Sequence, residues 1–281
     1  MPYVQGPQYY FILDDTNTLV GYTGILPAIL TIPTSVNSRS VLAIGEGAFA
    51  GSSSLVNVTI NPGGVYNSLP NNLFNGCVNL TTVTISGITS IGNNVFQGCT
   101  SLTSVTLPAD LTTLGTYAFE GCAALTSIII PDLITELADF LFSNCTNLAS
   151  VSLPANLLSI RTHTFATCSS LISLTLPETL TTISVGAFIQ CGIANIIIPA
   201  AVTLIDAYAF YLSGLLSITF VSLTPPVFGS GGVIDPQQQY TFQFVSDTAV
   251  MYIPNAADNA TWVATVTAPN VYWTGTVVNL P

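Results

Sequence analysis

The sequence has almost no basic side chains. Lysine is absent, and the only arginines are Arg39 and Arg161, against thirteen carboxylates, so the formal net charge is −11. Proteins bind nucleic acid largely by neutralising phosphates with Lys and Arg, and binding to an anionic membrane surface needs the same side chains. We therefore exclude nucleic acid as a partner and expect no attachment to anionic lipid.

Long hydrophobic runs are also missing, although 49% of the residues are hydrophobic and the mean hydropathy is +0.65. The densest stretches, 25–32 and 193–199, are interrupted by Pro, Thr or Asn and are shorter than the roughly 20 residues that cross a bilayer. The first residues, MPYVQG, have neither the basic nor the apolar region of a secretory signal. We expect no membrane insertion and no recognisable signal peptide.

What the sequence does contain is a repeat. A phenylalanine returns every 22 to 25 residues, and the same frame returns around it; a clear copy runs from 91 to 111 as IGNNVFQGCTSLTSVTLPADL. Such a period indicates stacked repeat units that bury a continuous core together. The eight positions are Phe49, Phe74, Phe96, Phe119, Phe142, Phe165, Phe188 and Phe210.

Each unit contains two different periodicities. Val105 and Leu107 alternate with polar residues and are followed by Pro108, which predicts a short strand that ends at the proline. Apolar residues then recur every three to four positions over 111–119, which favours a short helix or 3₁₀ turn on the opposite wall. The strands of successive units are expected to form one parallel sheet.

The repeated frame, Ile-Gly-x-x-Ala-Phe-x-Gly-Cys-x-x-Leu-x-x-Val-x-Leu-Pro, resembles the BspA-type leucine-rich repeats. The resemblance implies an α/β solenoid: a leucine-rich repeat horseshoe with one parallel β-sheet on its inner face and short helices or 3₁₀ turns on its outer face. We divide the chain into an N-terminal cap at 1–43, about eight repeats at 44–223, and a C-terminal cap with a strand-like tail at 224–281. Members of this family are usually displayed outside the cell.

Six cysteines occupy the same position of successive repeats. Stacked side chains point in one direction and not at one another, so we expect buried free thiols and no disulfides. No CxxC pair occurs and the chain has a single histidine, so no metal site is expected. This predicted cysteine ladder consists of Cys77, Cys99, Cys122, Cys145, Cys168 and Cys191.

No catalytic constellation is evident. His163 lies two residues before Phe165, at a position that varies between repeats, and no G-x-S-x-G motif accompanies it; we interpret it as a surface residue. Arg161 is placed to reach Asp139 or Glu136 of the preceding unit in a surface ion pair. We expect a chain that is not an enzyme and that has no cofactor.

The exposed positions of the predicted strands are uncharged and rich in hydroxyl groups. Such a surface can hydrogen-bond sugars or lie against another protein, although Thr and Ser also simply suit exposed strand positions. The candidate concave binding face consists of Thr84, Thr106, Ser152, Thr175 and Thr219.

Two functions remain open. The first is a non-enzymatic structural or surface protein, a repeat scaffold that assembles with itself or other subunits as part of a surface layer, filament or virion, because few charges mean little repulsion between copies. The tail, with alternating residues at 271–278, could pair with a neighbouring copy. The second is an adhesin that recognises a glycan or a host protein through its concave Ser/Thr-rich face. Both place the chain outside a cell or on a cell or virion surface.

Overall fold

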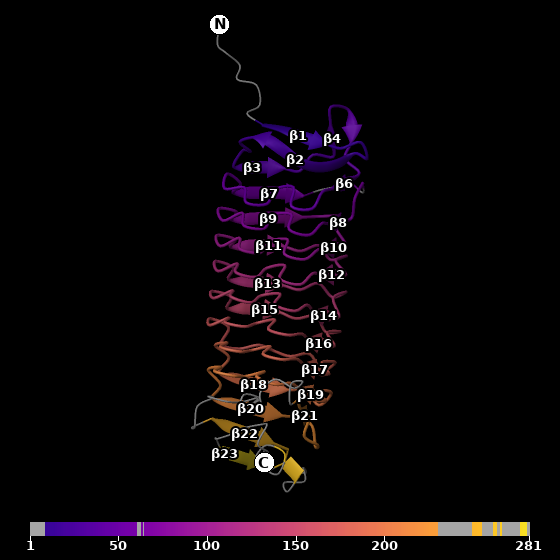
Figure 1. The fold of residues 1–281 in the computed structure, drawn as a ribbon. Coiled ribbons are helices and arrows are strands. Elements are labelled where there is room, and N and C mark those ends of the chain that lie inside the picture. The colour runs from indigo at the N-terminus through magenta and orange to yellow at the C-terminus, as the bar shows by residue number, and fades with distance from the viewer. Residues whose placement is uncertain are drawn as a thin grey trace.

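The fold is a column of stacked coils. The computed structural model describes residues 9–60, 63, 65–229, 249–254, 261–262, 265 and 276–279. Each coil makes one circuit of the column, and between residues 65 and 229 the successive coils advance from the N-terminal end towards the C-terminal end (Figure 1). Within the described residues, helical conformation is confined to 261, 262 and 265. The molecule is therefore a β-solenoid.

One wall of the column, which we call the strand face, carries the longer strands in parallel register. The alternation of buried and exposed residues follows from the period of two, with Val83 and Ile85 buried and Thr84 exposed on one strand. The strands are β3 (Ile29–Thr31), β7 (Asn57–Ile60), β9 (Thr82–Ile85), β11 (Ser104–Thr106), β13 (Ser127–Ile129), β15 (Ser150–Ser152), β18 (Asn195–Ile198), β20 (Ser217–Phe220), β22 (Val250–Ile253) and β23 (Thr276–Asn279).

A second wall carries parallel strands of only two residues. In each, the second residue is apolar and points into the core, as Ile91 does in β10. These strands are β8 (Ser68–Leu69), β10 (Ser90–Ile91), β12 (Thr113–Leu114), β14 (Glu136–Leu137), β16 (Ser159–Ile160), β17 (Thr182–Ile183), β19 (Leu204–Ile205) and β21 (Val227–Phe228). The expectation of a single parallel sheet was therefore incomplete.

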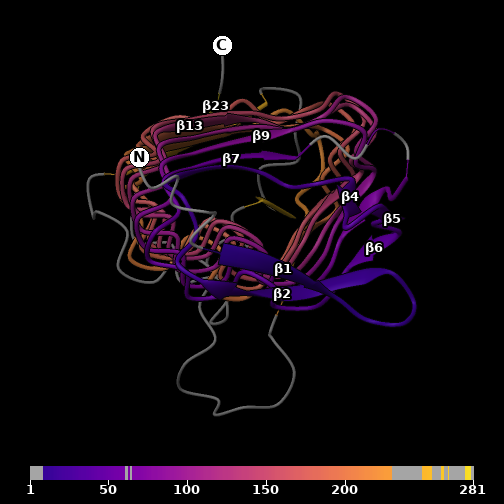
Figure 2. The same cartoon turned by 90° about the horizontal axis from the view of Figure 1, so that it is seen from above.

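An antiparallel hairpin closes the N-terminal end. Strand β1 (Tyr9–Leu13) pairs with β2 (Thr18–Gly24), and β2 pairs in parallel with β6 (Ala43–Ile44). A smaller hairpin joins β4 (Ser35–Val36) and β5 (Arg39–Ser40). Viewed along the column, β1 and β2 cross the side opposite the strand face (Figure 2). At the other end β23 pairs with β22 of the same chain.

The eight phenylalanines of the repeat form a continuous stack through the core. All eight are fully buried, and neighbouring rings lie 5.3 to 5.7 Å apart between centroids with nearly parallel planes. Tyr22 continues the stack beyond Phe49 at 5.9 Å, and Phe11 meets Phe49 edge-on. The hairpin therefore covers the first ring of the stack, which would otherwise be exposed.

A third wall, which we call the turn wall, replaces the predicted helices or 3₁₀ turns. Its N–H groups alternate between local and inter-coil acceptors. Glu120 N donates to Tyr117 O within its coil, whereas Tyr117 N donates to Asp139 O and Gly121 N to Ser143 O of the next coil. Tyr117 and Gly121 also have φ of 59° and 70°. Two left-handed residues per coil cannot be part of a right-handed helix, so the helical prediction was wrong in the described residues.

The column is nearly straight, so the predicted horseshoe is also wrong (Figure 1). A horseshoe arises when helices about 10 Å wide form one wall and strands about 4.8 Å apart form the other. Here every wall is joined from coil to coil by backbone hydrogen bonds along most of the column, and the ring stack continues through it with centroids 5.6 Å apart. Because all walls rise by the same amount per coil, the column does not bend.

The strand pairing is interrupted at one level of the column, which we call the seam. Among the described strands, β11 does not pair with β13, and β12 does not pair with β14. The turn wall keeps its bonds across the seam, including the 2.8 Å bond from Gly121 N to Ser143 O. A second interruption, on the strand face alone, lies between β15 and residues 173–175. These two interruptions border hollows that are described below.

Close stacking of the coils makes some glycines irreplaceable. A Cβ on Gly115 would lie 2.4 Å from the carbonyl carbon of Gly92 in the preceding coil, so we expect Gly115→Ala to lower the free energy of unfolding by at least about 2 kcal/mol. Urea denaturation followed by circular dichroism measures the change.

The matched control is Gly121→Asn. Gly121 has φ of 70°, and Asn144 occupies the same position one coil later with φ of 61°. A Cβ on Gly121 would meet nothing closer than 3.7 Å, so this variant should unfold within about 1 kcal/mol of the wild type. Equal stability of the two variants would show that contact with Gly92 does not limit coil spacing.

Candidate binding face

Each strand of the strand face turns alternate side chains outward. Thr84, Thr106, Ser152 and Thr175 are exposed and Thr219 is partly exposed. Their hydroxyl groups can donate and accept hydrogen bonds. The structure therefore places all five sequence-predicted residues on one wall, although the wall is straight and not concave.

Three adjoining hollows open on this wall. The first, of about 440 Å³, lies at the seam between β11 and β13 and includes Thr106. The second, of about 480 Å³, lies between β15 and residues 173–177 and includes Ser152 and Thr175. The third, also of about 480 Å³, reaches from Thr175 to Thr219. Four of the five candidates line a hollow, and Thr84 does not.

The structure adds two isoleucines that sequence reasoning had not singled out. Ile129 and Ile197 occupy an outward strand position that Thr or Ser fills in the other coils from β3 to β20, and they are 73% and 60% exposed. Ile129 lines the first hollow together with Asp132, and Ile197 lines the third together with Glu178. Alignment of the repeats would have identified both isoleucines as exceptions at the outward position. No sequence pattern marks the interruptions of the sheet beside them.

The six cysteines lie in the core as free thiols. Cys77 Sγ donates to Phe49 O at 3.1 Å, and Cys99, Cys122, Cys145 and Cys168 repeat this bond to the phenylalanine at the equivalent position, at 3.1 to 3.2 Å. Burial raises the pKa of Cys77 to about 11 and that of Cys145 and Cys191 to about 12. At neutral pH the ladder is therefore protonated and unreactive.

His163 belongs to a second, outer aromatic stack. Its ring lies 4.8 Å from that of Phe140, which lies 4.7 Å from that of Tyr117. On its other side the imidazole covers Gly186, where a Cβ would lie 2.8 Å from His163 Nε2. Burial lowers the pKa of His163, and Asp139 partly opposes this. The residue lies partly exposed on the outer wall, as the sequence predicts, and its ring also packs between neighbouring coils.

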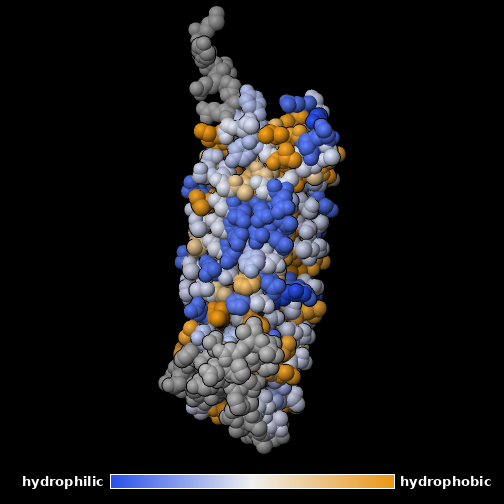
Figure 3. Space-filling model, viewed as in Figure 1, coloured by the Kyte–Doolittle hydropathy of each residue, from blue (hydrophilic) through white to orange (hydrophobic). Residues whose placement is uncertain are grey.

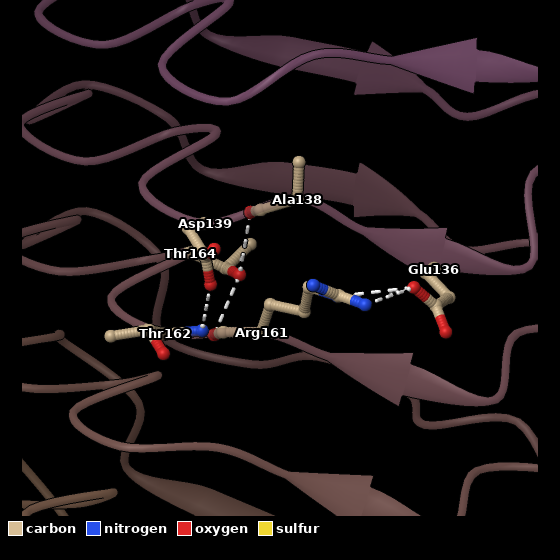
Figure 4. A network of polar contacts seen from close by, with 6 residues as sticks. All are labelled: Glu136, Ala138, Asp139, Arg161, Thr162 and Thr164. Atoms are coloured by element: carbon tan, nitrogen blue, oxygen red, sulfur yellow. Dashed lines mark hydrogen bonds and ion pairs between the residues drawn. The ribbon is translucent and has the colours of Figure 1, made fainter.

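Arg161 anchors a polar network on the second wall. Its Nη2 lies 2.8 Å from Glu136 Oε2, which confirms the predicted ion pair; both side chains are about half exposed, so the pair contributes little stability. Thr162 N donates to Asp139 Oδ1 at 3.0 Å, and Thr164 Oγ1 donates to Arg161 O (Figure 4). The network secures adjacent coils beyond the seam.

Amide side chains form a further polar network on the turn wall. Asn72 Nδ2 donates to Glu46 Oε1, Asn75 Nδ2 donates to Gln97 Oε1, and Gln97 Nε2 donates to a Glu120 carboxylate oxygen. Figure 3 shows hydrophilic side chains gathered at the height of β7 to β11 on the face turned to the viewer. Because these amides bond to one another from coil to coil, we assign them a role in stacking.

In the part of the chain that the structure describes, no helix has the length and apolar character to cross a lipid bilayer. The same residues include no group of three or more His, Cys, Asp or Glu side chains arranged to hold a metal ion.

Comparison with known proteins shows to which family of repeats these units are similar. The family model described as "BspA type Leucine rich repeat region" matches residues 30–149 and 89–217. No curated protein is similar enough in sequence to match the chain.

Solved structures share the fold. A leucine-rich repeat protein from Bacteroides ovatus is 22% identical, with a TM-score of 0.66 over 99% of this chain and 77% of the other. A leucine-rich cell surface protein from Faecalibacterium prausnitzii is 21% identical, with a TM-score of 0.59 over 100% and 95%. The leucine-rich repeat protein of T. pallidum is 25% identical, with a TM-score of 0.55 over 66% and 86%.

Proposed function

Because the chain belongs to the BspA-type leucine-rich repeat family, we propose that it is a non-enzymatic interaction module that binds a protein through its strand face. The observation that carries the proposal is the row of three adjoining hollows between Ser104 and Thr219. Their surface combines hydroxyl groups with two exposed isoleucines. A surface of this kind can bury apolar contacts and still satisfy the polar groups of a partner.

The proposed absence of catalysis rests on the state of the reactive side chains. The six thiols are buried and protonated, both ring faces of His163 are covered, and Arg161 is paired with Glu136. None of these groups faces a hollow of the strand face. A nucleophile would need a base beside it in an accessible site.

We further propose display on a surface. The similar protein from F. prausnitzii is described as a cell surface protein. The strand face extends along the column, so all of it is accessible to a partner when the column projects from a cell or a virion. The net charge of −11 disfavours contact with an anionic membrane, which supports a face directed away from lipid.

A second candidate function is self-assembly into a surface layer, filament or virion. The observation that favours it is the position of two strands at the ends of their sheets, β1 at one end of the column and β23 at the other. Strand β1 presents Tyr10 and Ile12, which are 67% and 43% exposed. Such edges can template pairing between copies. The predicted pairing of the tail with a neighbour is weakened, because β23 pairs with β22 in its own chain.

Light scattering over a range of protein concentrations separates the two candidates. The interaction module should keep a mass near 29.4 kDa, whereas assembly through sheet edges should give species that grow with concentration.

Binding through the strand face is tested on arrays of proteins and of glycans with a triple variant, Thr106→Glu, Ser152→Glu and Thr175→Glu. Three carboxylates in the hollows should abolish binding to arrayed proteins, because burying unpaired charge opposes association. The matched control adds the same charge elsewhere, through Thr113→Glu, Thr135→Glu and Asn156→Glu, which are exposed and lie outside the three hollows. Retained protein binding in the face variant, or binding to glycans alone, would contradict the proposal.

A further inference from the structure

The strand face repeats one chemical pattern at two places. In the first hollow Ile129 is exposed beside Asp132, and in the third hollow Ile197 is exposed beside Glu178. From β3 to β20 the equivalent strand position otherwise holds Thr or Ser, whereas Tyr252 of β22 and Val278 of β23 occupy it at the C-terminal end of the column. Each of the two hollows therefore offers an apolar contact with a carboxylate next to it, and the hollow between them offers hydroxyl groups from Ser152 and Thr175.

The spacing of the two isoleucines is set by the coils. Strand β13 carries Ile129, β18 carries Ile197, and two coils with Ser152 and Thr175 lie between them. The turn wall stays hydrogen-bonded from coil to coil at these levels, as from Phe142 N to Thr164 O and from Phe165 N to Ala187 O, so three coil steps of about 4.8 Å separate the isoleucines by about 14 Å along the column axis. In an extended polypeptide, side chains four residues apart point to the same side and lie about 13 Å apart. The two lengths agree.

From this agreement we infer that the partner of the strand face is an extended polypeptide segment that lies along the column axis, with apolar side chains at positions i and i+4 and basic residues beside them. The two apolar side chains contact Ile129 and Ile197. The basic residues face Asp132 and Glu178. The inference rests on the proposed function and specifies its ligand.

The hydroxyl groups between the isoleucines suit a peptide backbone. A hydroxyl group both donates and accepts, so Ser152 and Thr175 can bond to either the N–H or the C=O groups of a chain whose direction is not fixed. An extended segment has its backbone groups free for such bonds. A glycan would use the hydroxyl groups but would leave both isoleucines without an apolar partner, and the three hollows contain no aromatic ring on which a sugar could stack.

The charges around the hollows support a basic partner. The chain carries a net charge of −11 with two arginines, of which Arg161 is paired with Glu136 and Arg39 is bonded to Asp14 O and Asn17. Asp132 and Glu178 are exposed at the hollows. Lysine or arginine in the segment would be attracted to the face, with an effect mainly on the association rate and its dependence on salt.

The test uses the full chain and fluorescein-labelled peptides of twelve residues, in which two isoleucines stand in a Ser/Thr background flanked by lysines. Five peptides place the isoleucines two, three, four, five or six residues apart. Fluorescence polarisation gives Kd for each. Spacings of two and six keep both side chains on one side but change the distance, and spacings of three and five put them on opposite sides. We expect the spacing of four to bind about tenfold more tightly than any other.

Ile129→Ser and Ile197→Ser should each weaken binding of the best peptide about tenfold and remove its preference for the spacing of four. The matched control is Ile172→Ser, because Ile172 is 63% exposed but lines none of the three hollows; it should leave Kd unchanged. Asp132→Asn and Glu178→Gln together should reduce the salt dependence of Kd.

Absence of peptide binding, or equal binding at all five spacings, overturns the inference. The proposed function would still stand in that case if the charged triple variant lost binding to arrayed proteins. Protein binding that is insensitive to the charged triple variant would remove the proposed function and the inference together. Binding of arrayed glycans alone would also overturn both, because it would assign the hydroxyl groups to sugars.

Discussion

Raising the pH from 9 to 11 should unfold this protein cooperatively. The six cysteines are buried and free, and burial raises the pKa of Cys77 from 9.0 to about 11 and that of Cys145 to about 12. In the unfolded chain the thiols ionise near pH 9, whereas in the folded chain they stay protonated. The stabilisation is therefore fully present below pH 9 and is lost as the pH rises towards 11.

The size of the effect follows from the number of thiols. Each buried thiol lowers the free energy of unfolding by about 1.4 kcal/mol per pH unit in this window, so six together contribute a slope of about 8 kcal/mol per pH unit. A free energy of unfolding of about 5 to 15 kcal/mol would therefore fall to zero within two pH units above pH 9. Burial also raises the pKa of Tyr66, to about 12, which adds to the slope above pH 10. Urea denaturation at intervals of half a pH unit gives the slope directly.

The control replaces half of the ladder, through Cys122→Ala, Cys145→Ala and Cys168→Ala. The smaller side chains will change stability at every pH, but the slope between pH 9 and 11 should fall to about half of the wild-type slope. An unchanged slope in this variant would show that groups other than the thiols cause the alkaline unfolding.

Phe142→Ala should lower the free energy of unfolding by about 3 to 5 kcal/mol, the range for removing a fully buried aromatic side chain. Phe142 is completely buried and lies between Phe119 and Phe165, with both centroid distances at 5.6 Å. Its loss would leave a cavity that two neighbouring coils share, and each coil depends on its neighbours for its core. Urea denaturation followed by circular dichroism measures the loss.

Phe140→Ala is the matched control, because it removes the same side chain two residues away. Phe140 belongs to the outer stack, between Tyr117 and His163, and its φ is 56°. The expected loss is about 0.5 to 1.5 kcal/mol, the range for an aromatic contact. Comparable losses in the two variants would show that the inner stack is not the main support of the column.

The strand face and the core could be predicted because the residues that form them recur at short, regular intervals in the sequence. The alternation around Val83 and the return of Phe142 at a fixed interval report burial directly, and the structure buries both residues. Stacking of identical units also predicts that cysteines in the same position form one ladder. Local residue patterns suffice for these features because each repeat has the same environment as the next.

The turn wall could not be predicted from the same patterns. Apolar residues such as Ala118 and Phe119 follow a helical spacing, but the backbone at Tyr117 and Gly121 is left-handed. Glycine at 121 suggests such a conformation, whereas tyrosine at 117 does not. What decides the outcome is the inter-coil hydrogen bonds, as from Tyr117 N to Asp139 O, and these depend on a neighbour 22 residues away.

The candidate site was only half predictable. The repeat frame gives the outward positions, so Thr106, Ser152 and Thr175 could be named in advance. The hollows depend on where the sheet is interrupted, and the repeats beside β11 and β13 read like all the others. The sequence prediction selected outward residues with hydroxyl groups and therefore left out Ile129 and Ile197. These two isoleucines depart from the Thr/Ser pattern, and the proposal of an extended polypeptide partner depends on them.

The seam gives the column a defined mechanical weak point. The hydrogen bonds between coils run along the column axis, so a pulling force along that axis loads the coil interfaces in series, and the interface with the fewest bonds opens first. Where β11 and β12 face β13 and β14, both ladders are missing, and the backbone bonds that remain are those of the turn wall and the bond from Ala124 N to Thr100 O. Tension on a protein anchored at one end and bound at the other would separate the coils there, beside Ile129, and would release a bound segment before the rest of the column unravelled.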